Sequence, residues 1–373
     1  MNLILKRQIS TFFWILIALI SLLYGPMAIE YFAHFFTPNA PKLWLHVFTW
    51  FAGEKHTQGA GSVEVVQHTV YTHSRVSMLF HTVAGGTAIL LASLQFYTPF
   101  RKKYPHIHRT IGKVFMTIVV ISMIGSISFL IATGPKESFN GLPFYLQLWI
   151  LALGTLTSAI LGVIAIIKGQ LKMHQAAMIF CFALLLSAPV LRIEWLFIGG
   201  LLNVTHQTSN FFSSLIFGYL VVPCAIAATR LTDFRKSSAS SRLTFTAVDK
   251  GLIGLGILAT LAIAAKYRMQ IGELTNVTIC VIILAVMTLA AYGLAWRASV
   301  RAHNEVAIKE WRIHLLAYFI SPIVFIVFWQ ILCQFTTVYE AFEATSFTAP
   351  PIAFAIGYLF MAISRYVKRA PLA

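Results

Sequence analysis

Long apolar runs alternate with short polar segments along almost the whole chain. A helix needs about 20 apolar residues to cross the hydrocarbon core of a bilayer. Runs of about this length predict ten membrane spans, at roughly 10–33, 76–98, 110–133, 143–168, 175–200, 210–229, 250–266, 276–297, 314–335 and 348–366. The pattern therefore predicts an all-α fold, a polytopic transmembrane helical bundle of about ten spans.

Composition points the same way. Hydrophobic residues make up 58% of the chain and charged residues 11%, whereas soluble domains are about 45–50% apolar and about 25% charged. The formal net charge of +16 would suit a nucleic-acid-binding protein. However, the basic residues are divided among short loops between apolar runs. We therefore expect the lipid bilayer as the surroundings of this chain and no nucleic acid as a partner.

The basic residues also predict the orientation. Cytoplasmic loops of membrane proteins carry an excess of Lys and Arg. With the N-terminus inside, 21 of the 28 basic residues fall on the cytoplasmic side. We therefore expect both termini in the cytoplasm (N-in and C-in) and a location in the cell inner membrane.

The runs and loops divide the chain into four predicted segments. Residues 1–75 hold the first span and an outer loop that contains histidines, and 76–229 form a core membrane block of spans two to six. Residues 230–249 are a basic, Ser-rich cytoplasmic linker, and 250–373 form a second membrane block. In the outer loop, residues 41–51 predict a short amphipathic helix along the membrane surface.

Two polar residues lie deep in apolar runs on the outer side. His81 is in the second span and Arg192 in the fifth; at about 1.5 Å per residue, each lies roughly 8–12 Å below the outer surface. Gly85 and Gly86 follow His81 by one turn and allow close approach of a helix or ligand. Pro189 precedes Arg192 and leaves a backbone carbonyl without its helical donor. Charged groups in a membrane are expensive and indicate a functional site.

Two interpretations of this pair follow. In the first, His81 and Arg192 form an outer-leaflet pocket for a substrate or an anion. In the second, Arg192 forms a buried structural pair with Glu194 or Glu30 that orients the helices.

His108 and His174 lie at the inner ends of the third and fifth spans, again at matching depth. Two imidazoles on facing helices are the ligands of a six-coordinate haem b, and Arg109 among other basic residues is placed to hold the propionates. A quinone or another membrane protein would then exchange electrons with the haem. The alternative is that these residues are interfacial anchors.

Other histidines give weaker signals. Six of them lie between residues 34 and 81, near Glu54 and Glu64, but their spacing is not that of a helix-borne metal site, so solvated loop histidines explain them better and we predict no metal site. His303 and His314 flank the entry to the ninth span, where we expect boundary anchors.

One set of residues carries a family resemblance over about 75–200: an intramembrane His, then His-Arg-x-x-Gly, then a second His and an Arg. In this chain they are His81, His108, Arg109, Gly112, His174 and Arg192. The pattern resembles a bacterial multi-pass family known only as predicted membrane proteins of unknown function. It is also loosely similar to four-helix cytochrome b-type electron carriers, which implies His ligands on facing helices.

Three classes of function remain. One is a haem b redox protein that uses His108 and His174. The second is a transporter or small-molecule-binding protein that uses His81 and Arg192. The third is a non-enzymatic assembly or accessory factor. The sequence has no P-loop, dinucleotide fingerprint, HExxH or GxSxG motif, and it identifies no catalytic residue.

Overall fold

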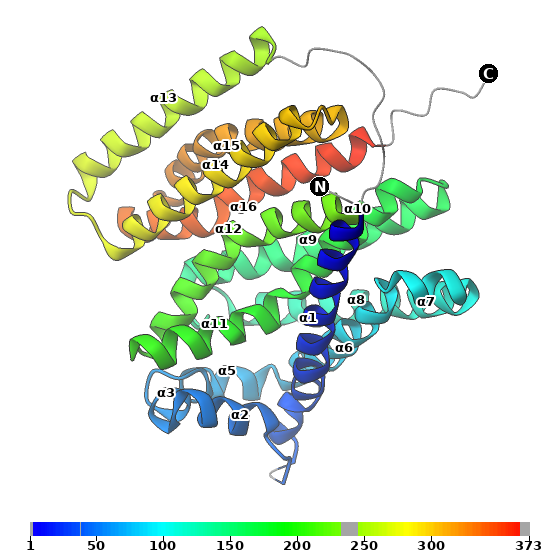
Figure 1. Cartoon of the computed structure of the whole chain (residues 1–373). Helices are drawn as coiled ribbons and strands as arrows, with labels where there is room; N and C mark the ends of the chain where they lie inside the picture. The colour runs from blue at the N-terminus through cyan, green and yellow to red at the C-terminus, as the bar shows by residue number, and fades with distance from the viewer. Residues whose placement is uncertain (1–2, 38, 233–244, 366–373) are drawn as a thin grey trace. The chain divides into compact units, whose positions relative to one another are not determined.

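The computed structural model describes residues 3–37, 39–232 and 245–365. In this part of the chain every regular element is a helix (Figure 1). Within the described residues, ten helical spans are long and apolar enough to cross a membrane. The predicted all-α fold with ten spans is therefore confirmed.

Each long helix overlaps one apolar run, but several begin earlier than the run does. In chain order the long helices are α1 (Leu3–Glu30), α6 (Arg75–Gln95), α8 (Pro105–Thr133), α9 (Gly141–Ile167), α10 (Leu171–Leu185) with α11 (Ser187–Leu202), α12 (His206–Thr232), α13 (Ala247–Gln270), α14 (Asn276–Arg301), α15 (Glu305–Leu332) and α16 (Val338–Ser364). Shorter helices are η1 (Tyr31–Phe35), α2 (Leu43–Ala52), α3 (Glu54–Gln58), α4 (Val63–Val66), α5 (His68–His73) and α7 (Thr98–Lys103).

The chain forms two compact units. Unit 1 comprises Met1–Leu161 and Met178–Ser214, and unit 2 comprises Gly162–Ala177 and Leu215–Ala373. The core of unit 1 is an apolar cluster of α6, α8, α9 and α10 side chains, among them Ile89 and Phe115. A core of unit 2 lies around Trp329, with side chains from α13, α15 and α16. The predicted linker 230–249 falls mostly outside the described residues, and the four-segment division stays a prediction.

Glycines bring α6 into backbone contact with its neighbours in unit 1. A Cβ on Gly86 would lie 2.8 Å from the carbonyl oxygen of Gly25 in α1, and one on Gly125 of α8 would lie 2.6 Å from the carbonyl oxygen of Ser77. Small residues permit such contacts in membrane helices. The packing fixes α6, and with it His81, between α1 and α8.

The fifth span is not one continuous helix. α10 ends at Leu185 and α11 begins at Ser187. Pro189 has no N–H and cannot donate to the carbonyl of Leu185, whereas Val190 N donates to Leu186 O at 3.0 Å. The interruption at Leu186 lies one turn before Pro189, whose missing N–H predicts it, and six residues before Arg192.

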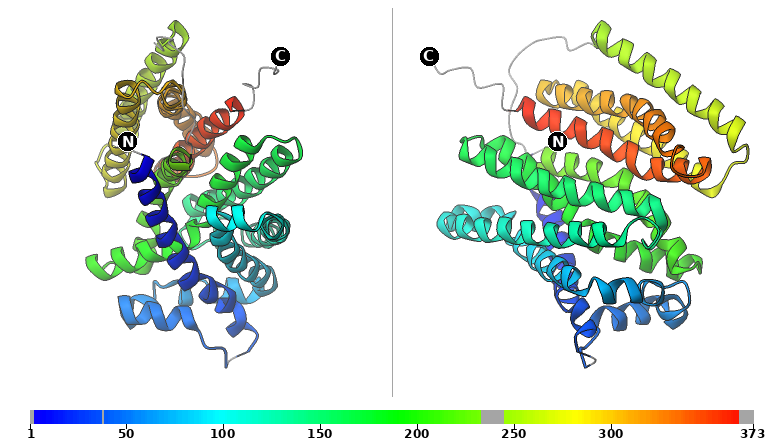
Figure 2. Two further views of the ribbon diagram at one scale, coloured as in Figure 1. Left: turned by 45° about the vertical axis from the view of Figure 1, so that its right-hand side comes forward. Right: turned by 180° about the vertical axis from the view of Figure 1, so that it is seen from behind.

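The outer loop folds into the short helices α2 to α5, gathered beside the C-terminal end of α1 (Figure 2). The predicted helix over 41–51 is present as α2. The Glu30 carboxylate accepts hydrogen bonds from the backbone N–H groups of Lys42 and Leu43, both at 2.9 Å. It thereby supplies acceptors for two N–H groups at the start of this helix that have no partner within the helix. Trp44 and Phe48 of α2 are buried, whereas Trp50 is 79% exposed.

Candidate functional site

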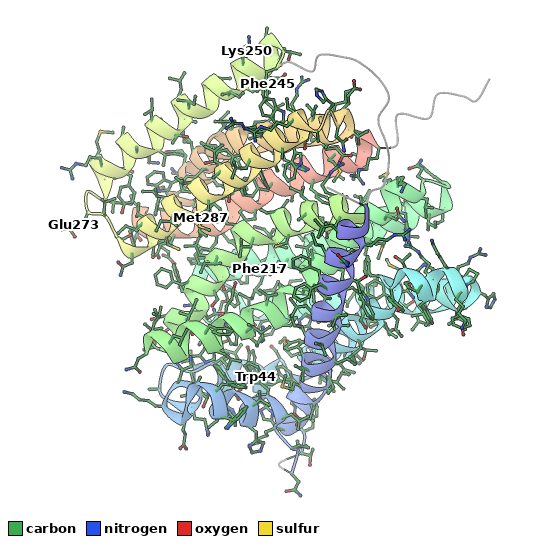
Figure 3. The ribbon with its side chains drawn as sticks, in the orientation of Figure 1. Trp44, Phe217, Phe245, Lys250, Glu273 and Met287 are labelled. Carbon is green, nitrogen blue, oxygen red and sulfur yellow. The ribbon has the colours of Figure 1, made fainter. Side chains whose placement is uncertain are left out.

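Unit 1 contains a partly open cavity of about 190 Å³. Its wall combines α1, α6, α8, α9, α10, α11 and α12 with residues of the outer loop (about 34–75), the outer segment. Trp44, Val63 and Tyr71 are the outer-segment residues in this wall; Trp44 is labelled on α2 (Figure 3). The folded outer loop is therefore part of the cavity.

His81 lies in the cavity wall, and α8 holds its ring in place. Its Nδ1 is 3.0 Å from the backbone oxygen of Ser122. Because a carbonyl oxygen only accepts, Nδ1 carries the hydrogen, and Nε2 of the neutral ring is an acceptor. The Ser122 hydroxyl in turn donates to His81 O at 2.9 Å.

Arg192 lies in the same wall and is half-buried. Its guanidinium lies over the ring of Trp195, 4.6 Å from the centroid, which is a cation–π contact. Within the described residues it forms no ion pair. In particular, Glu30 is occupied at the start of α2, and Glu194 is two positions away, on another face of α11. The structure therefore does not contain the alternative pairing of Arg192 with Glu194 or Glu30.

Two tyrosines of the wall were not predicted. The Tyr31 hydroxyl donates to Glu64 Oε1 at 2.8 Å. Burial raises the pKa of Tyr71 to about 12, although the nearby charge of Arg192 acts in the opposite direction. At neutral pH, Tyr71 therefore presents a protonated hydroxyl, a hydrogen-bond donor, in the wall that holds Arg192.

The two predicted haem ligands belong to different units. His108 and the exposed Arg109 are on α8 in unit 1, where Gln95 Nε2 donates to His108 O at 3.2 Å. His174 is on α10 in unit 2, and its Nδ1 is 2.8 Å from Gly162 O. None of the three lines the cavity. Haem ligation by His108 and His174 stays a prediction.

The histidines of the outer segment do not gather into a metal site. Across the described ranges, no group of three or more His, Cys, Asp or Glu side chains is placed to hold a metal ion. His56 instead stacks on the ring of His206, with 5.2 Å between centroids.

Unit 2 contains a buried polar cluster that the sequence analysis missed. Glu310 of α15 binds Arg365 through two hydrogen bonds of 2.8 Å and binds Arg230 of α12 at 2.5 Å. His314, expected at the membrane boundary, is buried, with 1% exposed. Arg230 and Arg365 are among the 21 basic residues predicted on the cytoplasmic side, and the structure places both in an ion network between helices.

Comparison with known families identifies the central part of the chain. Residues 78–229 match the family model described as "Predicted membrane protein (DUF2306)". The predicted resemblance is thus confirmed. The matched segment runs from α6 to α12 and contains His81, His108, His174 and Arg192. No curated protein and no solved structure gives a significant match. The chain is thus a membrane protein whose matched segment resembles a family of unknown function.

Proposed function

We propose that this protein binds a small organic anion in the cavity of unit 1, as a transporter or a membrane-embedded binding protein. The observation that carries the proposal is the guanidinium of Arg192 in the cavity wall, without an ion-pair partner in the described part of the chain. An Arg at the centre of a membrane helix costs about 2.5–3.5 kcal/mol on insertion scales. An anionic ligand supplies the counter-charge.

Neighbouring groups suit the same ligand. The ring of Trp195 holds the plane of the guanidinium, which favours bidentate binding of a carboxylate. The protonated Tyr71 hydroxyl adds a donor for an anion. His81, with Nδ1 committed to Ser122, contributes its Nε2 as a hydrogen-bond acceptor.

The rest of the wall limits the size and polarity of the ligand. Apolar side chains, including Ile89, Met123 and Phe129, line the cavity. An apolar protein cavity of about 150 Å³ accepts benzene, and this one has about 190 Å³. A carboxylate on a benzene-sized apolar body matches both the volume and the chemistry.

Calorimetric titration of the purified full-length protein with benzoate tests the proposal. We expect saturable binding of benzoate and weaker binding of benzamide, which has a similar shape and no charge. Loss of one charge-assisted hydrogen bond costs about 1.5–3 kcal/mol, so Arg192→Leu should weaken benzoate binding about 10- to 150-fold, and Arg192→Lys should weaken it less.

Arg268→Leu is the matched control. Arg268 is an exposed arginine of α13 in unit 2 that donates to Gly272 O at 2.9 Å. This variant should bind benzoate like the wild type. Equal affinity of the wild type and Arg192→Leu, or no saturable binding of benzoate, would contradict the proposal.

A further inference from the structure

Asn210, in the cavity wall, has a side-chain oxygen without a hydrogen-bond partner in the described structure, and its neighbour Asn140 shows which atom that is. Asn140 Nδ2 donates to the backbone oxygen of Gln207 at 3.0 Å, which fixes the orientation of the Asn140 amide, because a carbonyl only accepts. Asn140 Oδ1 then accepts from Asn210 Nδ2. The remaining atom, Asn210 Oδ1, is buried and has no hydrogen-bond partner in the described structure. Asn210 is 0% exposed and lines the cavity.

Trp195, in the same wall, has a hydrogen-bond donor that lacks an acceptor in the described structure. Its residue is 3% exposed, and its Nε1–H, which can only donate, has no partner within the described residues. The ring of His206 is nearby, 4.6 Å between centroids. However, Val63 N donates to His206 Nδ1 at 3.3 Å, so His206 Nε2 carries a hydrogen and cannot accept from Trp195.

Trp195 and Asn210 line the same cavity as Arg192, and His206 connects them. His206 and Asn210 are four residues apart on α12 and therefore share a helix face, and Trp195 contacts the first of them as well as Arg192. A buried polar group left without a partner costs about 1–3 kcal/mol. The wall therefore combines a cation, an unused donor and an unused acceptor.

A hydroxyl group satisfies both unused atoms, because it accepts one hydrogen bond and donates another. A second carboxylate would leave Asn210 Oδ1 unsatisfied. An ammonium group would leave Trp195 Nε1 unsatisfied and would be repelled by Arg192. We infer that the ligand is a small hydroxycarboxylate: its acid group binds Arg192, and its hydroxyl accepts from Trp195 Nε1 and donates to Asn210 Oδ1. This inference rests on the proposed function.

The test compares benzoate with the three hydroxybenzoate isomers by calorimetry on the full-length protein. A neutral hydrogen bond contributes about 0.5–1.5 kcal/mol. Two of them should therefore make one isomer bind about 5- to 150-fold more tightly than benzoate. Trp195→Phe, which keeps an aromatic ring under Arg192, and Asn210→Leu should each reduce this preference several-fold. The measured quantity is the ratio of the two dissociation constants in each variant.

Trp50→Phe is the matched control, because Trp50 is a tryptophan of the same unit that is 79% exposed. It should leave the ratio unchanged. If the wild type binds benzoate and all three isomers equally, water satisfies the two atoms and this inference is wrong, while the proposed function stands. If no acid binds, both are wrong. If Trp195→Phe and Asn210→Leu both keep the full preference, the hydroxyl is recognised elsewhere and the inference is again overturned.

Discussion

At the scale of single residues, His56 shows how the outer segment accommodates a half-buried imidazole. Its Nδ1 donates to the backbone oxygen of Val204 at 2.9 Å, and its ring packs on His206 and against the edge of Phe48. Burial lowers the pKa of His56, while the hydrogen bond to Val204 acts in the opposite direction. The fold therefore favours the neutral ring.

The lowered pKa of His56 predicts a loss of stability in acid. A histidine in the unfolded chain titrates near 6.5, so between that pH and the lower pKa of the folded state the unfolded chain binds more protons. Stability therefore falls as the pH decreases below about 6.5. Thermal unfolding in detergent should show a smaller decrease in Tm from pH 7.5 to 5 for His56→Gln than for the wild type.

His73→Gln serves as the control for this measurement, because His73 is an exposed histidine of the same outer segment. Its Tm should decrease with pH as much as that of the wild type. An identical decrease in wild type and His56→Gln would show that His56 does not contribute.

The sequence pattern predicts some residues of the cavity wall and not others. His81 and Arg192 stand out because each interrupts an apolar run. Tyr31, Tyr71 and Trp195 do not, because aromatic residues near span ends are ordinary membrane anchors. Their part in the wall depends on how the outer segment and α11 fold back against the other spans, which the local pattern does not encode.

At the scale of elements, the contact between α6 and α8 depends on Gly125. A Cβ there would lie 2.6 Å from Ser77 O and 2.8 Å from His81 N. Both are backbone atoms of a helix and cannot move aside independently. Gly125→Ala should therefore separate α8 from α6, lower stability by about 1–3 kcal/mol and weaken ligand binding, because His81 is held by Ser122 of α8. Thermal unfolding and calorimetry of the variant measure the two effects.

Gly254→Ala provides the comparison for Gly125→Ala. Gly254 lies within α13, and a Cβ there meets no atom within 4 Å. Alanine favours a helix over glycine by about 0.5–1 kcal/mol, so Tm should stay the same or rise. Equal effects of the two substitutions would indicate that the tight contact at Gly125 does not limit stability.

The number of helices was predictable from the apolar runs, whereas their ends were not. The ninth run begins near residue 314, but α15 begins at Glu305, and α12 extends to Thr232. The turns that lie beyond the apolar runs contain Glu310 in α15 and Arg230 in α12, and these two side chains form an ion pair inside unit 2. A hydropathy pattern detects the apolar part of a helix, but it does not detect polar turns at the ends of the same helix.

At the scale of the whole molecule, membrane physics explains why the fold class was predictable. In lipid, each backbone N–H and C=O needs an internal partner, so apolar runs of sufficient length form helices. The hydropathy pattern constrains the packing of these helices against one another much less. The division into two units passes through α10, which contributes Leu171–Ala177 to unit 2 and its remaining residues to unit 1. Nothing in the hydropathy of that run marks the division.

The orientation of the whole chain is the remaining prediction. Because 21 of the 28 basic residues fall on one side of the ten spans, both termini should be cytoplasmic. Reporter fusions after Lys103, Lys236 and Lys368 should therefore give cytoplasmic signals, and a fusion at Gly59, between α3 and α4, should give an outside signal. The result bears on function, because Trp44, Val63 and Tyr71 of the outer segment belong to the cavity wall. An outside signal at Lys103 together with a cytoplasmic signal at Gly59 would reverse the orientation and place this end of the cavity on the cytoplasmic side.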